Sequence, residues 1–228
     1  TGAASQVRDH DWLSRHIPEG ADAALSDVTD DMAVLGVMGP KSRKLLQGLT
    51  NVDLGNDAFP YLTSRDIEIG GVLIRATRIT YVGELGWELY IPIDAAPGIF
   101  DAITDAGGDH GLALAGTHAM NSLRIEKAYR HWGHDIGDQD TGLEAGLGFA
   151  IAWDKPGGFI GRDALLEQRR TGVKRRLVQF ALEDPDGDRG LIVLGGGKNL
   201  AFAGRDRGVA VDQAGEDTAQ RFDAGAQG

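Results

Sequence analysis

The chain has 228 residues, with 34 acidic against 23 basic side chains and a formal net charge of −11 at pH 7. This negative charge excludes strong non-specific binding of nucleic acid, because such binding requires basic side chains opposite the phosphates. Cysteine is absent, which excludes disulfides, thiolate zinc sites and cysteine nucleophiles, and no run of 18 apolar residues is present from which a transmembrane helix could form.

The first half of the chain is predicted to alternate helices with strands. Apolar spacing over residues 10–17 is typical of a short amphipathic helix, and residues 33–38 show a buried-strand pattern. Pro40 suits the first turn of a leucine-rich helix. Further strands are expected at 66–69, 72–81 and 87–91. A turn with two glycines separates the last two strands, which indicates a hairpin.

The second half continues the same mixture of elements. We expect helices at 97–106, 117–129 and 162–170, and strands at 148–153 and 175–182. Because the order is mixed and antiparallel hairpins occur, the expected fold class is α+β rather than a doubly wound parallel sheet.

A change in composition near Pro185 predicts a domain boundary. Residues 189–228 hold 9 glycines and 7 alanines, and their 5 basic and 5 acidic side chains cancel. Few apolar runs interrupt this segment, and a segment of this kind packs poorly. We therefore expect residues 1–187 to form the folded part and residues 188–228 to form a Gly/Ala-rich tail.

Glu88 is the first candidate for a ligand-binding side chain. Period-two alternation places Trp87 and Leu89 on one face of the strand, toward the core, and Glu88 on the other face. A carboxylate held on a rigid strand can accept two parallel hydrogen bonds from an amidine-like edge, either a guanidinium or the 2-amino-N3 edge of a pterin. The alternative is an exposed glutamate paired with a surface arginine.

Arg124 is the second candidate. It has no local partner at a favourable helical spacing, so it is expected to bind a carboxylate elsewhere in the protein or on a ligand. Glu126 and Arg130 stand four apart on the predicted helix and are expected to pair. A histidine- and aspartate-rich stretch follows at 131–135, but no fixed face presents its imidazoles together, so we predict no metal site.

Several motifs in fixed order resemble the glycine-cleavage T-protein (aminomethyltransferase) family. Residues 37–40, followed by leucines, are similar to the family's G-P-x-A/S stretch, and residues 79–90 match its Y-x-G-E-x-G-x-E signature. Residues 122–126 and 140–146 are similar to its S-L-R-x-E and T-P-L-E-A-G segments. The sequence of residues 126–135 looks most like the corresponding sequence in the C-terminal folate-binding half of sarcosine and dimethylglycine dehydrogenases. The likeness extends over about residues 1–187.

This resemblance implies a T-protein-like folate-binding fold with a central channel for tetrahydrofolate. The family's strand glutamate, which grips the pterin, falls on Glu88, and the tyrosine that lines the pocket falls on Tyr81. The family's arginine, which contacts the ligand or supports the pocket, falls on Arg124. An aromatic residue that lines the site has its nearest match in Phe149.

Two departures from the family pattern lead us to expect a fragment. Family members begin about a hundred residues earlier, in a region that supplies a catalytic aspartate, and the dehydrogenases carry an N-terminal flavin domain. The fold is thus expected to be incomplete at its N-terminus, with FAD belonging only to a missing domain. The family's small C-terminal barrel has no recognisable counterpart in residues 188–228, so the C-terminus is expected to be atypical.

The resemblance implies the tetrahydrofolate-binding part of a sarcosine or dimethylglycine dehydrogenase or of an aminomethyltransferase. Such a part captures a one-carbon unit as 5,10-methylene-tetrahydrofolate, and without the catalytic aspartate and flavin domain we do not expect catalysis by this chain alone. The alternative is a non-catalytic folded remnant, or a partner-subunit module with weak or no folate binding. The expected partners are tetrahydrofolate and a flavin-dependent dehydrogenase domain or subunit, without nucleic acid or membrane. No secretory leader opens the sequence, which favours a cytoplasmic location.

Overall fold

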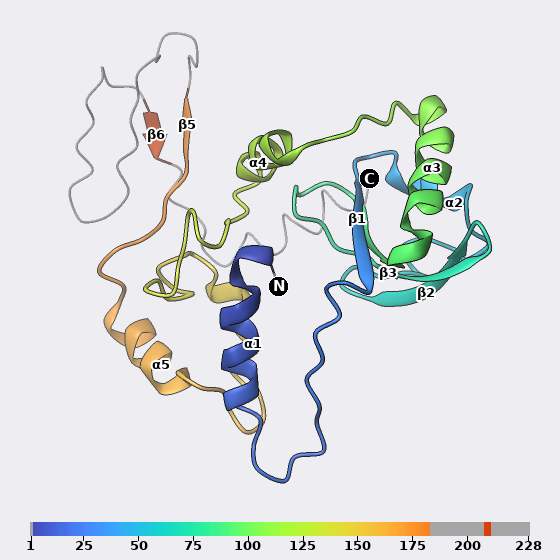
Figure 1. The fold of residues 1–228 in the computed structure, drawn as a ribbon. Coiled ribbons are helices and arrows are strands. Elements are labelled where there is room, and N and C mark those ends of the chain that lie inside the picture. Colours follow the sequence, from blue (N-terminus) through green and yellow to red (C-terminus); the bar gives the residue numbers. More distant parts are fainter. Residues whose placement is uncertain (1, 183–207, 211–228) are drawn as a thin grey trace. The chain divides into compact units, whose positions relative to one another are not determined.

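The structure is a computed structural model that describes residues 2–182 and 208–210 (Figure 1). The chain divides into two compact units. The first holds Thr1–Thr80 and Gly86–Ala113, and the second holds Tyr81–Leu85 and Leu114–Gly228. The predicted boundary near Pro185 and most of the predicted tail lie outside the described residues.

A four-stranded antiparallel sheet forms the centre of the first unit. Its strands are β1 (Met32–Met38), β2 (Ser64–Ile69), β3 (Val72–Thr77) and β4 (Gly86–Pro92), in the order β1-β4-β3-β2. The hairpin of β2 and β3 turns at Gly70 and Gly71, whose φ angles of 59° and 80° suit a tight turn that other residues rarely adopt. The β3–β4 pairing confirms the hairpin predicted between these two strands.

Strand β3 ends four residues before the predicted end at residue 81. Beyond Thr77 the backbone of Arg78 pairs with the segment that precedes β2, where its amide donates to Thr63 and its carbonyl accepts from Leu62. Leu62 has a φ of 62°, which bends the facing chain out of the extended conformation. The regular ladder therefore stops at this point.

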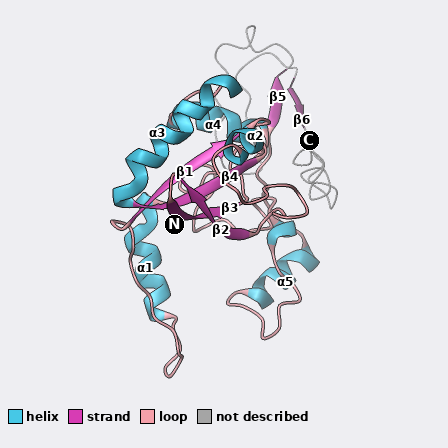
Figure 2. Cartoon of the chain, turned by 90° about the vertical axis from the view of Figure 1, so that its right-hand side faces the viewer, coloured by secondary structure: helices cyan, strands magenta, loops and turns pink. Residues whose placement is uncertain are grey.

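One face of the sheet forms the core. Trp87, Leu89 and Ile91 are fully buried, as the alternation predicts. The helices α2 (Ser42–Gln47) and α3 (Ala96–Gly107) both contact β4 and each other, so they cover this same face (Figure 2). The opposite face carries Glu88 and Tyr90 together with the exposed apolar side chains of Val34 and Leu73.

The first unit also contains a helix without a buried face. Helix α1 (Gln6–Arg15) follows the 3-10 turn Ala3–Ser5 and has no buried residue. It begins four residues before the predicted start, because its first turn is polar and apolar spacing does not register it. Short 3-10 turns, Ile93–Ala95 and Gly108–His110, flank α3.

The second unit has little regular structure among its described residues. Its elements are α4 (Thr117–Glu126), a 3-10 turn (Gly148–Ala150), α5 (Arg162–Thr171), and the paired strands β5 (Phe180–Leu182) and β6 (Gly208–Ala210). Within residues 2–182 and 208–210, no helix combines the length and apolar character needed to cross a membrane.

Three predictions in the second unit need correction. The strand expected at 148–153 is wrong, because the amides of Ala150 and Ile151 bond back to carbonyls three residues earlier and form a turn. The helix expected to reach 129 ends at Glu126, since Ala128 adopts a φ of 57° that a helix cannot contain. The strand expected from residue 175 begins only at Phe180.

Candidate functional site

Glu88 lies on the polar face of β4, in the middle of the sheet. Its cross-strand neighbours are Gly36 on β1 and Thr77 on β3. The side chain is half-buried, and its Oε2 accepts a hydrogen bond of 2.9 Å from the Tyr90 hydroxyl. Its Oε1 accepts no hydrogen bond from any described residue. Gly36 itself has no side chain, but the Met38 side chain of β1 reaches over it, with its Cε 3.3 Å from where a Cβ at Gly36 would lie.

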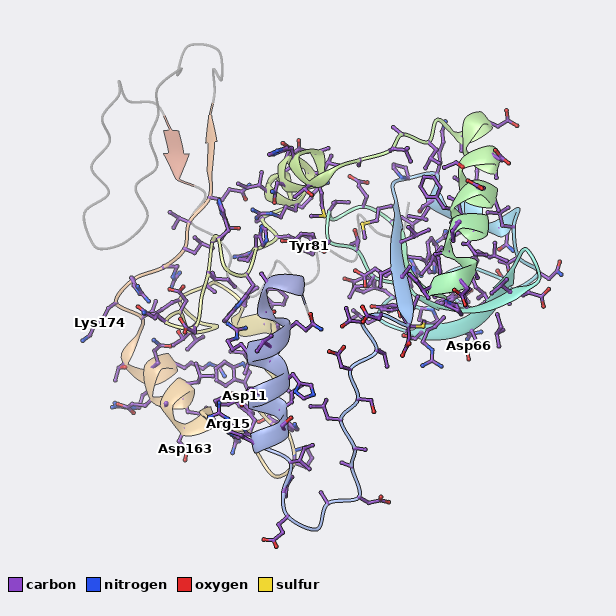
Figure 3. All side chains as sticks on the ribbon, in the orientation of Figure 1. Asp11, Arg15, Asp66, Tyr81, Asp163 and Lys174 are labelled. Carbon is purple, nitrogen blue, oxygen red and sulfur yellow. The ribbon has the colours of Figure 1, made fainter. Side chains whose placement is uncertain are left out.

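The predicted alternative for Glu88, a pair with a surface arginine, is not what the described residues show. The arginine on the neighbouring strand, Arg75, bonds instead to Asp66 on β2, which Figure 3 labels, with 3.0 Å from Nε to Oδ1. Burial raises the pKa of Tyr90, and the hydrogen bond to Glu88 raises it further. Tyr90 thus remains a protonated donor that fixes the orientation of the carboxylate.

Tyr81 belongs to the second unit, together with the loop that follows it. The ring, labelled in Figure 3, meets the edge of the Tyr129 ring with 6.0 Å between centroids, and its hydroxyl donates to the Arg130 carbonyl at 3.2 Å. The loop contacts the end of α4, where Lys127 Nζ lies 3.5 Å from Glu84 Oε1. Burial raises the pKa of Tyr81, while the Arg124 charge opposes this shift.

Arg124 lies on the last turn of α4 and is 3% exposed. Its guanidinium binds a carboxylate of the protein itself, with Nη1 2.5 Å from Asp135 Oδ2 and Nη2 3.5 Å from Asp135 Oδ1. Nε donates to Asn121 at 2.9 Å and Nη1 also donates to the Tyr129 carbonyl at 2.8 Å. The sequence left open whether Arg124 binds a carboxylate of the protein or of a ligand. In the structure its partner is a carboxylate of the protein.

Asp135, from the histidine- and aspartate-rich stretch at 131–135, is the partner of Arg124 that sequence reasoning did not identify. It also accepts from the His131 amide at 2.9 Å, and its Oδ1 lies 2.7 Å from His134 Nδ1. Burial acts to raise its pKa, but the hydrogen bonds from His134, His131 and Arg124 together hold the pKa below its ordinary value. Asp135 stands eleven residues after Arg124, beyond the helix, so no periodicity could have linked the two.

One other expectation in this region is contradicted by the geometry. The predicted pair of Glu126 with Arg130 is wrong, because the helix ends at Glu126 and the four-residue spacing no longer places the two on one face. Arg130 donates instead to the carbonyls of Ala128 and Ala145. Among the described residues, no group of three or more metal-ligating side chains is arranged to hold an ion.

The structure brings two of the four predicted site residues into one network. Tyr81 and Arg124 are linked through the backbone of Tyr129 and Arg130. Phe149 lies on the 3-10 turn of the same unit, is 56% exposed and has no ring contact with a described aromatic side chain. Glu88 belongs to the first unit.

Comparison with known proteins identifies the family. The model described as the GCVT N-terminal domain matches residues 1–155, about two thirds of the chain. A second model, described as NAD-specific glutamate dehydrogenase, matches residues 159–228, and much of that stretch lies outside the described ranges.

Two curated relatives are enzymes of N-methylated amines. Human mitochondrial dimethylglycine dehydrogenase is 40% identical over 196 residues, which cover 84% of this chain and 23% of that protein. The 4-methylaminobutanoate oxidase (formaldehyde-forming) of Paenarthrobacter nicotinovorans is 47% identical over 186 residues, or 82% of this chain and 22% of that protein. The chain thus spans less than a quarter of the length of these relatives.

A solved structure shares the fold. The glycine cleavage system aminomethyltransferase T from Bartonella henselae matches with a TM-score of 0.65 at 23% identity, covering 80% of this chain and 48% of that one. This likeness confirms the predicted α+β, T-protein-like fold.

Proposed function

The chain belongs to the family described as the GCVT N-terminal domain, and from that premise we propose that it is the tetrahydrofolate-binding part of an N-methyl amine dehydrogenase or of an aminomethyltransferase. The enzyme would be a dimethylglycine or sarcosine dehydrogenase, or an aminomethyltransferase. The names of two relatives, a dimethylglycine dehydrogenase and a 4-methylaminobutanoate oxidase, support this substrate class. Tetrahydrofolate supplies the nucleophilic nitrogen that takes up the one-carbon unit, which leaves as 5,10-methylene-tetrahydrofolate.

Glu88 carries the proposal. The 2-amino group and N3–H of a pterin present two parallel donors, and a carboxylate is the side chain that accepts both. Glu88 meets this requirement because its Oε1 is unengaged among the described residues and its Oε2 keeps a second lone pair beside the bond from Tyr90. The carboxylate is also held on a strand paired on both sides, so little rotamer freedom is lost when a ligand binds.

The other three residues take supporting roles in this proposal. Tyr81 offers its ring to the ligand, and the contact with Tyr129 holds this ring edge-on. Arg124 supports the backbone beside Tyr81, since its donors are engaged by Asn121 and other groups of the protein. The exposed ring of Phe149 offers an apolar surface to the ligand.

Oxidation of the amine requires a redox cofactor, because no amino-acid side chain accepts a hydride. We propose that a flavin-dependent domain or subunit provides this step and that the present chain orients the folate. Orientation is itself catalytic, since it turns the capture of the carbon into an effectively unimolecular event.

A binding titration tests the proposal. Isothermal calorimetry of the chain with 5-formyl-tetrahydrofolate, a chemically stable reduced folate, is expected to show saturable binding at one site. Folic acid, whose pterin ring is flat and oxidised, serves as the comparison ligand. The absence of saturable binding by either compound would refute the folate role and favour the alternative, a module that contacts only a partner protein.

A further inference from the structure

The second unit contains a buried guanidinium, that of Arg124. Arg124 is 3% exposed, and a charge so removed from water is costly unless it is paired and hydrogen-bonded. Its carboxylate partner in the described residues is Asp135, at 2.5 Å. Removal of the Asp135 charge would therefore leave the guanidinium buried without this carboxylate partner.

Asp135 does more than neutralise this charge. It also accepts from the amide of His131, and its other oxygen lies against the imidazole of His134. Both donors belong to the turn that follows α4, which a bridge between Trp132 and Ile136 closes. One carboxylate thus ties the helix to the turn at residues 131–136.

This tie extends to Tyr81 through two consecutive backbone carbonyls. Arg124 Nη1 donates to the carbonyl of Tyr129 at 2.8 Å, and the next carbonyl along, that of Arg130, accepts from the Tyr81 hydroxyl at 3.2 Å. The Tyr129 ring also meets the Tyr81 ring edge-on at 6.0 Å. The place of the Tyr81 ring is therefore set by groups that Arg124 and Asp135 hold.

We propose that Asp135 is a positioning residue for Tyr81, acting through Arg124 and the backbone of residues 129–130. It fixes the tyrosine ring in the conformation that receives the ligand without itself contacting the ligand. The inference rests on the proposed function insofar as Tyr81 lines the folate site. Loss of the Asp135 charge is expected to displace the ring and to weaken binding of a reduced folate by about 2- to 10-fold, the equivalent of one neutral hydrogen bond.

The test combines a local probe of Tyr81 with a binding measurement. The chain has 4 tyrosines, so incorporation of 3-fluorotyrosine gives a fluorine spectrum in which Tyr81→Phe assigns the relevant signal. Asp135→Asn is compared with Asp138→Asn, which makes the same change at an exposed side chain three residues away. If Asp135→Asn does not fold, the double variant Arg124→Gln with Asp135→Asn replaces it, since no unpaired charge is then buried.

The expected result is a shifted Tyr81 signal and weaker 5-formyl-tetrahydrofolate binding in the Asp135 variant, with neither change in the Asp138 variant. An unshifted Tyr81 signal in a destabilised protein would overturn the inference, because Asp135 would then be merely structural. A shifted signal with unchanged affinity would overturn it as well. Where the wild-type chain binds no folate, the proposed function fails, and the Tyr81 signal alone decides whether Asp135 positions the ring.

Discussion

Replacement of Glu88 by glutamine is the sharpest test of the proposed pterin contact. The amide keeps the shape of the side chain and an oxygen that accepts from Tyr90, but it loses the negative charge and one acceptor. A hydrogen bond to a charged group is worth roughly 1.5–3 kcal/mol, so the affinity for a reduced folate should fall about 10- to 150-fold.

The strands of the same sheet offer a matched control. Glu68 on β2 faces the same side of the sheet, opposite Leu73, but it is exposed at the edge. Glu68→Gln makes the identical chemical change and the same change in net charge, so its affinity should equal that of the wild type. Tyr90→Phe removes the 2.9 Å bond that orients the carboxylate and should cost about 2- to 10-fold.

Calorimetry with 5-formyl-tetrahydrofolate at pH 7 measures all three variants against the wild type. Urea unfolding of each variant separates lost affinity from lost stability. Equal affinities for the wild type and Glu88→Gln, in proteins of equal stability, would remove Glu88 from the ligand site. A loss of the same size in Glu68→Gln would attribute the effect to net charge rather than to a specific contact.

Three further predictions concern stability and ionisation. Gly83→Ala should destabilise the chain by about 1–3 kcal/mol in urea unfolding, because φ is +73° and the new Cβ would lie 2.6 Å from Lys127 Cβ. Gly98→Ala, in a helix with open space around the new methyl group, should instead stabilise by roughly 0.5–1 kcal/mol. The pKa of Asp27 is lowered from 3.8 to about 2, chiefly by the hydrogen bond from the Thr29 hydroxyl. Its contribution to stability is therefore complete above pH 3.8 and lost as the pH falls through 2, and carboxyl NMR titration of Thr29→Ala should show a higher midpoint.

The spacing of apolar residues predicted the strands of the first unit well, because alternation along a strand depends only on neighbouring residues. Alternation along β4 identified Trp87 and Leu89 as core residues and Glu88 as the opposite face, and the turn with two glycines before residue 87 indicated the β3–β4 hairpin. The same rule failed at residues 148–153. There the apolar side chains alternate, but the amides of Ala150 and Ile151 bond back to their own turn, and no strand among the described residues pairs with this segment.

The candidate site was predictable only in part, because its two halves depend on different kinds of information. The orientation of Glu88 follows from the strand that carries it. The partner of Arg124 is set by the path of the chain after the helix, where Ala128 adopts a left-handed conformation and turns the backbone back toward the guanidinium. Helical spacing identifies only residues that are neighbours on one face of a helix, so it cannot predict that Arg124 binds a carboxylate eleven residues away.

The Y-x-G-E-x-G-x-E signature is shared between the two units. Tyr81–Leu85 belongs to the second unit, whereas the strand that starts at Gly86 belongs to the first. The units are therefore interleaved along the chain, and no single cut yields both intact. A piece ending at Ala113 would retain the loop without Lys127 and Arg130, to which it bonds, and the complementary piece would lack the loop. Dissection by truncation would damage both parts at once, so their separate contributions are better resolved by point substitutions in the complete chain.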